Sequence, residues 1–103
     1  MADSVRLHVV WDRVKSDANV RKHGVSFEEA SALFTLDGDY LELFDDAHSD
    51  EEDRFLAIGP IARGVVVVAY TESEEDVIRI ISARRASRRE VELYRRYLEG
   101  EAR

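Results

Sequence analysis

The stretch Val65-Val66-Val67-Val68-Ala69-Tyr70 is the longest uninterrupted apolar run in the chain. β-Branched residues favour an extended backbone, and a strand that is apolar on both faces is typical of the centre of a sheet. The run is too short to cross a membrane as a helix, which needs about 20 apolar residues. It therefore predicts the central strand of a buried sheet.

Shorter apolar or alternating segments surround this run and predict its partner strands. They are residues 5–9, 40–44, 55–59 and 77–82. A turn containing Pro60 and Gly64 precedes the central strand, and the acidic residues 72–76 follow it. Such short connections favour antiparallel neighbours, because a parallel pair needs a long crossover.

Two helices are predicted before the second strand. The first covers residues 12–23 and ends before Gly24, a residue type that suits a helix C-terminus. Its apolar side consists of Trp11, Val14 and Ala18. The second begins at a capping box formed by Ser26 and Glu29. Its buried stripe is predicted to be Phe27, Ala30, Leu33 and Phe34.

A third helix is predicted at the end of the chain, where Ser87 and Glu90 form another capping box and Gly100 closes the helix. Its apolar positions are Val91, Tyr94 and Leu98. The order of elements predicts an α+β fold with an N-terminal helical hairpin, an antiparallel β-sheet of four to five strands and a C-terminal helix. We expect residues 1–103 to form one domain.

The charge of the chain excludes several classes of protein. With 22 acidic and 15 basic residues the net charge is −7, which argues against a uniformly basic nucleic-acid-binding protein. There is no cysteine, which excludes disulfides and cysteine-ligated zinc. The first residues lack a basic start and an apolar segment, so we expect a cytoplasmic protein. The charge is uneven, because residues 45–53 are strongly acidic whereas residues 77–103 are basic.

The arginines of the basic segment carry the strongest physical signal. Four of them surround the junction between the last strand and the last helix: Arg84, Arg85, Arg88 and Arg89. Positive side chains at a helix N-terminus oppose the helix dipole, so local stability does not explain them, and they predict a polyanion or an acidic partner. Arg79, between Ile78 and Ile80, forms either a cross-strand ion pair or a group presented to a ligand.

Three further features each allow two interpretations. Lys22 and His23 either stabilise the C-terminus of the first helix or bind phosphate. Trp11 either belongs to the core or stacks on a nucleobase at the edge of a cleft. His48 is either an exposed histidine of a solvated acidic stretch or part of a metal site. The spacing of its acidic neighbours specifies no metal, so we predict none.

Several blocks, taken in order along the chain, resemble the BrnT-type toxins. They are Val10-Trp11-Asp12, Lys22-His23-Gly24-Val25-Ser26-Phe27, His48-Ser49 with Glu52-x-Arg54, Arg79-Ile80-Ile81-Ser82-Ala83-Arg84, and Ala86-x-Arg88-Arg89-Glu90. The resemblance covers roughly residues 8–97. It implies a small bacterial ribonuclease with a RelE-like fold, the toxin of a type II toxin–antitoxin system.

The resemblance also implies the partners and the chemistry. A ribbon-helix-helix antitoxin would neutralise the toxin, promoter DNA would be contacted only through the antitoxin, and the toxin would be dimeric within the complex. No cofactor and no membrane association are implied. RNA would be cleaved without metal, by attack of a 2′-hydroxyl on the adjacent phosphate, which requires proton transfer and cations around the transition state.

Motif positions give the predicted site residues. The catalytic candidates are Lys22, His23, Glu52, Arg79 and Arg84, and the predicted RNA contacts are Trp11, Arg54, Arg85 and Arg88. Arg79 and Arg84 would stabilise the transition state, Lys22 and His23 would support proton transfer or the leaving group, and Glu52 or Glu72 would be the base.

Arg79 and Arg84 can act on one phosphate only if both side chains lie on the same face of the sheet. Arg79 and Arg84 are an odd number of residues apart, so a straight strand would place them on opposite faces. Their joint action therefore requires a bend or a strand end near Ser82 and Ala83. A second hypothesis, a non-catalytic partner-binding or corepressor module, would use the same basic groove. RNA loss on expression of the protein distinguishes the two.

Overall fold

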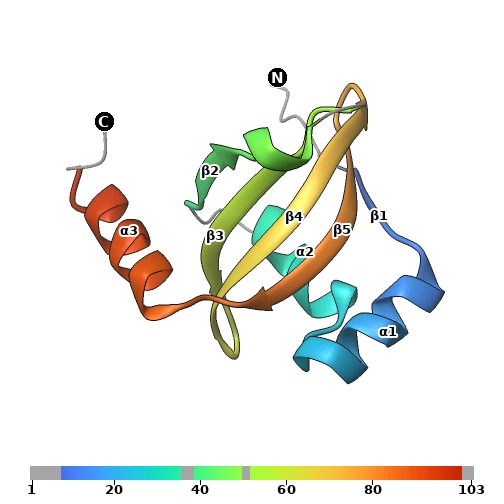
Figure 1. Cartoon of the computed structure of the whole chain (residues 1–103), viewed down its shortest axis with the longest axis horizontal. Coiled ribbons are helices and arrows are strands. Elements are labelled where there is room, and N and C mark those ends of the chain that lie inside the picture. Colours follow the sequence, from blue (N-terminus) through green and yellow to red (C-terminus); the bar gives the residue numbers. More distant parts are fainter. Residues whose placement is uncertain (1–7, 36–38, 50–51, 101–103) are drawn as a thin grey trace, which may run out of the picture.

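The computed structural model describes residues 8–35, 39–49 and 52–100. Its elements follow one another as strand, two helices, four strands and helix, with a short 3-10 helix between the second and third strands (Figure 1). They are β1 (His8–Val10), α1 (Arg13–His23), α2 (Phe27–Thr35), β2 (Leu41–Phe44), η1 (Asp46–His48), β3 (Phe55–Ile61), β4 (Gly64–Glu74), β5 (Val77–Arg85) and α3 (Arg88–Leu98). This order confirms the predicted α+β class. Residues 5–7 of the first predicted strand lie outside the described part of the chain.

The five strands form one sheet in the order β1-β5-β4-β3-β2. The predicted meander is confirmed for β2 to β5, whose neighbours are antiparallel, and β4 is central as its apolar run predicts. The sheet as a whole is mixed, because β1 lies parallel to β5. β1 and β5 are separated along the chain by two helices and three strands. No hairpin joins them, so nothing forces this pair to be antiparallel.

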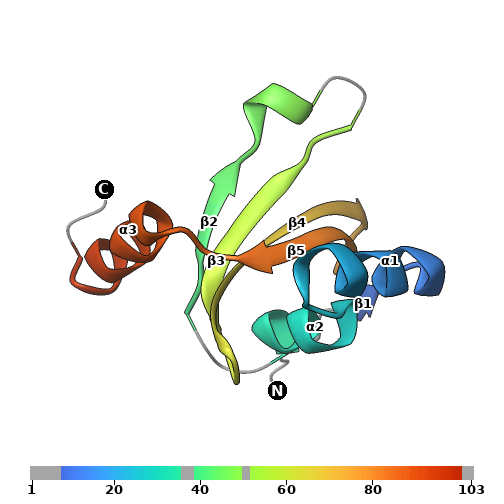
Figure 2. The ribbon, with the colours of Figure 1, turned by 60° about the horizontal axis from the view of Figure 1, so that its bottom comes forward.

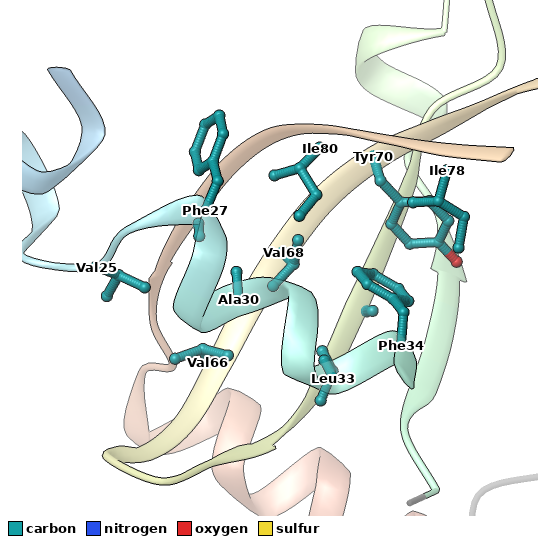
Figure 3. Close-up of a cluster of buried hydrophobic side chains, with 12 residues drawn as sticks. Val25, Phe27, Ala30, Leu33, Phe34, Val66, Val68, Tyr70, Ile78 and Ile80 are labelled. Carbon is teal, nitrogen blue, oxygen red and sulfur yellow. The ribbon is translucent and has the colours of Figure 1, made fainter. Parts of the chain in front are cut away.

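One face of the sheet is covered by α2, whose predicted buried stripe is confirmed (Figure 3). Its four apolar side chains pack against β4 and β5, and the ring of Phe34 meets that of Tyr70 edge to face at 4.9 Å. Gly59 of β3 allows this approach, because a Cβ there would lie 2.7 Å from Leu33 Cδ1. We call this the α2 face.

The other face, called the α3 face, is covered by α3 at one end only, and Figure 2 shows α3 on the side of the sheet opposite α1 and α2. Tyr94 is buried there in a cluster with Ile58 and Val67. Val91 and Leu98 of the predicted apolar side remain exposed. The capping box of Ser87 and the left-handed Gly100 after the helix are as predicted.

Of the predicted apolar side of α1, Trp11 packs against the core, whereas the prediction is wrong for Val14 and Ala18. Val14 is 74% exposed and Ala18 is also exposed, whereas the buried residues of α1 are the polar Ser16 and Asn19. Asn19 Nδ2 donates to the carbonyl oxygens of Val25 and Ala83, both at 2.7 Å, and Asn19 Oδ1 accepts from the Ala83 amide at 3.3 Å. α1 therefore lies along the part of the β5 edge that β1 leaves open, where backbone groups need polar partners.

The strands are longer than predicted, and one of them is irregular. Pro60 belongs to β3, where it pairs with Val65, rather than to the turn. In β5, Ile80 pairs with Tyr70 and Ser82 with Ala69, so Ile81 is an extra residue in a β-bulge. The bulge is the bend that Arg79 and Arg84 require. None of the described helices is long and apolar enough to cross a membrane.

Candidate active site

A row of side chains crosses the α3 face at the end of the sheet where β4 turns into β5. Arg79 of β5 pairs with Thr71 of β4 on one side and with Val10 of β1 on the other. Arg54 precedes Phe55, the partner of Tyr70, and therefore continues the row towards Thr71. The Asp45 amide donates to the Arg54 carbonyl oxygen at 2.8 Å, which extends the β2–β3 ladder by one pair. We call Asp45, Arg54, Thr71, Arg79 and Val10 the cross-sheet row.

The two arginines of this row carry charge that no described side chain neutralises. Arg79 is exposed, and its side chain makes no hydrogen bond or ion pair within residues 8–35, 39–49 and 52–100. Arg54 Nε and Thr71 Oγ1 are buried without a hydrogen-bond partner among the same residues. Strands are about 4.8 Å apart, so the backbones of Arg54 and Arg79 lie about 10 Å from each other. Two long cationic side chains are thus available to one anionic ligand on this face.

A hollow adjoins the β1 end of the row. It has a volume of about 300 Å³ and is lined by Val10, Trp11, Asp12 and Arg79. Trp11 is partly buried against the core, so its ring is held in place by packing. Asp12 caps α1 through hydrogen bonds from the amides of Val14 and Lys15, at 2.8 and 3.2 Å. The interpretation of Trp11 as a core residue is therefore confirmed in part, and the hollow next to Arg79 is where a nucleobase would stack if the other prediction holds.

The β2 end of the row holds His48, which is absent from the predicted site residues. The 3-10 helix η1 follows β2 and places His48 Nδ1 at 3.1 and 3.2 Å from the two carboxylate oxygens of Asp45. Ser49 Oγ donates to the Asp45 carbonyl oxygen at 2.6 Å and accepts from the Arg54 amide at 3.0 Å. Two signals in the sequence could have identified it: the His48-Ser49 block of the family resemblance, and the spacing of Asp45 and His48, which are three residues apart.

Arg84 lies on the same face as Arg79 but some distance from it. Its partner in β4 is Val67, four residues from Thr71, which corresponds to about 13 Å along the strand. The guanidinium of Arg84 forms two hydrogen bonds of 2.8 Å with the carboxylate of Glu90. This contact lowers the pKa of Glu90 to about 2 and raises that of Arg84. The charge of Arg84 is therefore largely engaged by α3.

The other predicted arginines are not gathered with Arg79. Arg85 pairs with Val66, a residue of the α2-face cluster, and so lies on the opposite face. Arg88 and Arg89 are exposed in the first turn of α3, as predicted. None of these three side chains has an ion-pair partner in the part of the chain that the structure describes.

The predicted proton-transfer residues are scattered. Lys22 and His23 lie in the last turn of α1, one turn beyond Asn19 at the edge of β5, and make no side-chain contact with a carboxylate of the described chain. Glu72 pairs with Ile78 and therefore lies on the α2 face, away from Arg79. Glu52 is exposed just before β3. Within the described ranges, no three histidine, aspartate or glutamate side chains are grouped to hold a metal ion.

Comparison with known proteins finds a protein family whose model matches this chain. A family model described as "Ribonuclease toxin, BrnT, of type II toxin-antitoxin system" matches residues 11–90. The chain is also similar to the 1.1 Å crystal structure of the Brucella abortus ribonuclease toxin BrnT, with a TM-score of 0.59 and 24% sequence identity. That match covers 80% of this chain and 99% of the other, and at this identity it supports the fold alone. No curated protein matches the chain significantly.

Proposed function

Since the chain belongs to the BrnT family of ribonuclease toxins of type II toxin–antitoxin systems, we propose that it cleaves RNA at the cross-sheet row without a metal ion. The 2′-oxygen of a ribose would attack the adjacent phosphorus, the bond to the 5′-oxygen would break, and a 2′,3′-cyclic phosphate would form. Negative charge accumulates on the phosphoryl oxygens during this step, so positioned cations lower its barrier.

One observation carries this proposal: the Arg79 side chain is exposed on the α3 face, in the same row as Arg54, and has no ion-pair partner in the part of the chain that the structure describes. Its guanidinium is open to solvent and so to a ligand, and guanidinium groups suit phosphate oxygens. The neighbouring hollow with Trp11 would receive a base next to the bound phosphate. Arg79 and Arg54 would therefore bind the reacting phosphate, and Trp11 an adjoining base.

The remaining candidates stay predictions for the same reaction. Arg84 would support the site through its link to α3, and Lys22, His23 and Glu52 remain candidates for proton transfer. Arg85 and Arg88 would contact RNA beyond the row.

The proposal is tested with the purified protein and a labelled RNA oligonucleotide. Arg79→Ala should lower the cleavage rate at least about 100-fold, the range seen when a group that stabilises transition-state charge is removed. Arg96→Ala is the matched control, because Arg96 is exposed on α3 and its ion-pair partner among the described residues is Glu92 of the same helix. A chelator should leave the rate unchanged, and the product should end in a cyclic phosphate.

Two results would contradict the proposal. An Arg79→Ala protein as active as wild type would remove the cross-sheet row from catalysis. Complete loss of activity on chelation, with a product that lacks the cyclic phosphate, would exclude the metal-independent mechanism.

A type II system includes a cognate antitoxin, and we propose a ribbon-helix-helix protein that bridges two toxins and alone contacts promoter DNA. The net charge of −7 supports DNA binding by the antitoxin alone, because the toxin would repel a DNA duplex over most of its surface. Light scattering of the co-purified pair should give a mass containing two toxin chains, and the isolated toxin should not shift promoter DNA in a gel. A shift by the toxin alone would contradict the proposal.

A further inference from the structure

We propose that His48 is the general base that removes the 2′-hydroxyl proton and that Asp45 is the residue that positions it. This inference rests on the proposed ribonuclease function and names its proton acceptor. It comes from the β2 end of the cross-sheet row, where a histidine, a carboxylate and Arg54 are joined by hydrogen bonds.

The first support is the geometry of the His48–Asp45 pair. His48 Nδ1 lies 3.1 Å from Asp45 Oδ2, and the His48 amide donates to the Asp45 carbonyl oxygen at 3.2 Å. The side chain of Asp45 is only 14% exposed, whereas that of His48 is 64% exposed. A shielded carboxylate thus holds one edge of the ring while the other edge faces solvent.

The second support is the tautomer that this pair selects. An ionised carboxylate can only accept hydrogen bonds, so the Nδ1 of neutral His48 must carry the hydrogen. The Nε2 lone pair is then free, which is the form that a general base requires. A carboxylate at Nδ1 also stabilises the imidazolium that forms once the proton is taken.

The third support is the connection to the phosphate-binding groups. Ser49 Oγ bonds both the Asp45 carbonyl oxygen and the Arg54 amide, so the short segment that carries His48 is tied to the start of β3. Asp45 and Arg54 are neighbours that extend the β2–β3 ladder, and the Asp45 amide donates to the Arg54 carbonyl oxygen at 2.8 Å. A base held at one end of the row and cations along it suit an RNA strand that lies across the α3 face with its reacting phosphate near Arg54.

The step is balanced with water as the only further reactant. The 2′-hydroxyl proton passes to His48 Nε2, the 2′-oxygen bonds to phosphorus, and the bond from phosphorus to the 5′-oxygen breaks. The leaving 5′-oxygen takes a proton from water, and His48 returns its proton to solvent. No oxidation, reduction or bound metal is required.

The other candidate bases lack this arrangement. His23, at the end of α1, has no carboxylate partner among the residues described, and Glu72 lies on the α2 face, away from Arg79. Glu52 is near Arg54 in sequence but makes no contact with it in the described chain.

The decisive experiment measures RNA cleavage and binding by histidine variants of the full chain. His48→Gln should lower kcat about 100-fold to 1,000-fold, as expected for loss of a general base. It should retain the wild-type affinity for an oligonucleotide with a 2′-deoxyribose at the cleavage site. Arg79→Ala, in contrast, should lose affinity for the same oligonucleotide. His8→Gln, another exposed histidine, should keep wild-type activity. Added imidazole should restore part of the activity of His48→Ala.

The role of Asp45 needs a readout that a purely structural role would not change. Asp45→Asn should lower kcat about 10-fold to 100-fold with KM retained, because the amide can donate to Nδ1 and favour the wrong tautomer. Asp46→Asn is the matched control on the exposed side of η1 and should keep the wild-type kcat. Equal losses in kcat and in substrate affinity would indicate a structural role and would overturn the assignment of Asp45.

The outcomes separate this inference from the proposed function. A wild-type protein that does not cleave RNA refutes the function and this inference with it. An active wild type whose His48→Gln variant keeps more than half of the activity overturns the inference and leaves the function intact. Loss of activity in His23→Gln together with an active His48→Gln would assign the base to α1 instead.

Discussion

At the scale of single residues, Glu90 decides how Arg84 is used. Its carboxylate accepts two hydrogen bonds from the Arg84 guanidinium and one from the Ser87 amide, so it closes the capping box and neutralises a strand arginine together. Arg84, which the sequence analysis assigns the same role as Arg79, thus serves mainly to attach α3 to the end of β5. Two arginines of one motif therefore have different surroundings and different availability to a phosphate.

Glu90→Gln tests this pair without removing the cap, because glutamine also fits a capping box. The pKa of Glu90 is lowered from 4.5 to about 2, chiefly by Arg84, so the pair stabilises the folded state above pH 4.5 and is lost as the pH falls through about 2. We expect the variant to lose about 1 kcal/mol at neutral pH, as for a partly exposed pair. Its unfolding free energy should then depend less on pH between those two values.

Urea unfolding across this pH range makes the comparison. Glu28→Gln is the control, since Glu28 lies exposed in the first turn of α2 and has no ion-pair partner within the described chain. A Glu90→Gln protein with the same pH dependence as wild type would show that the pair does not stabilise the fold.

At the scale of elements, α1 serves as a cover for a strand edge. β1 pairs with only the first three residues of β5, and Asn19 supplies a donor and an acceptor to Ala83 further along the same edge. Its side-chain amide thus replaces a peptide group of a missing neighbouring strand. A helix that is polar on its buried side is stable here because the edge needs hydrogen bonds rather than apolar contacts.

Asn19→Ala should therefore destabilise the protein far more than its polar character suggests. Two carbonyl oxygens and one amide lose their partner in a buried place, and we expect a loss of about 3 kcal/mol. Asp17→Ala, on the exposed side of the same helix, should change stability by no more than about 0.5 kcal/mol. Thermal or urea unfolding of both variants makes the measurement, and similar stabilities would contradict the role of Asn19 as an edge cover.

At the scale of the whole molecule, the net charge of −7 restricts where RNA can bind rather than whether it binds. Among the described residues, two acidic groups flank the end of the sheet that carries the cross-sheet row: Asp45, Asp46, Glu52 and Asp53 between β2 and β3, and the acidic residues of 72–76 where β4 turns into β5. An RNA strand would therefore be attracted only over a short length. Such a surface disfavours non-specific binding along a long stretch of RNA. Arg54 and Arg79 are then the groups that attract the RNA phosphates locally.

This charge distribution predicts a weak dependence of RNA binding on salt. Contacts to about three phosphates of a single strand give a slope of about −2 for the logarithm of the binding constant against the logarithm of the salt concentration. Fluorescence anisotropy with a 2′-deoxy analogue of the substrate measures this slope without cleavage. A slope that indicates many more phosphate contacts would contradict a site confined to the row.

The sequence predicted those parts of the molecule that depend on neighbouring residues. The capping boxes of Ser26 and Ser87, the stripe of α2 and the central position of β4 follow from spacing within one element and appear as expected. The sequence also identified Arg79 as an unusual residue in an apolar strand. These signals are local, because propensity, capping and periodicity act over a few residues.

The tertiary structure alone decided which side chains meet. The parallel pairing of β1, the bulge at Ile81, the use of Asn19 as an edge cover and the pairing of Arg84 with Glu90 all join segments whose relation no spacing encodes. The cross-sheet row is the clearest case, because its five residues come one each from the five strands or from the positions directly beside them. Register and sheet order bring those residues together, and both are set by the packing of the whole chain rather than by any one element.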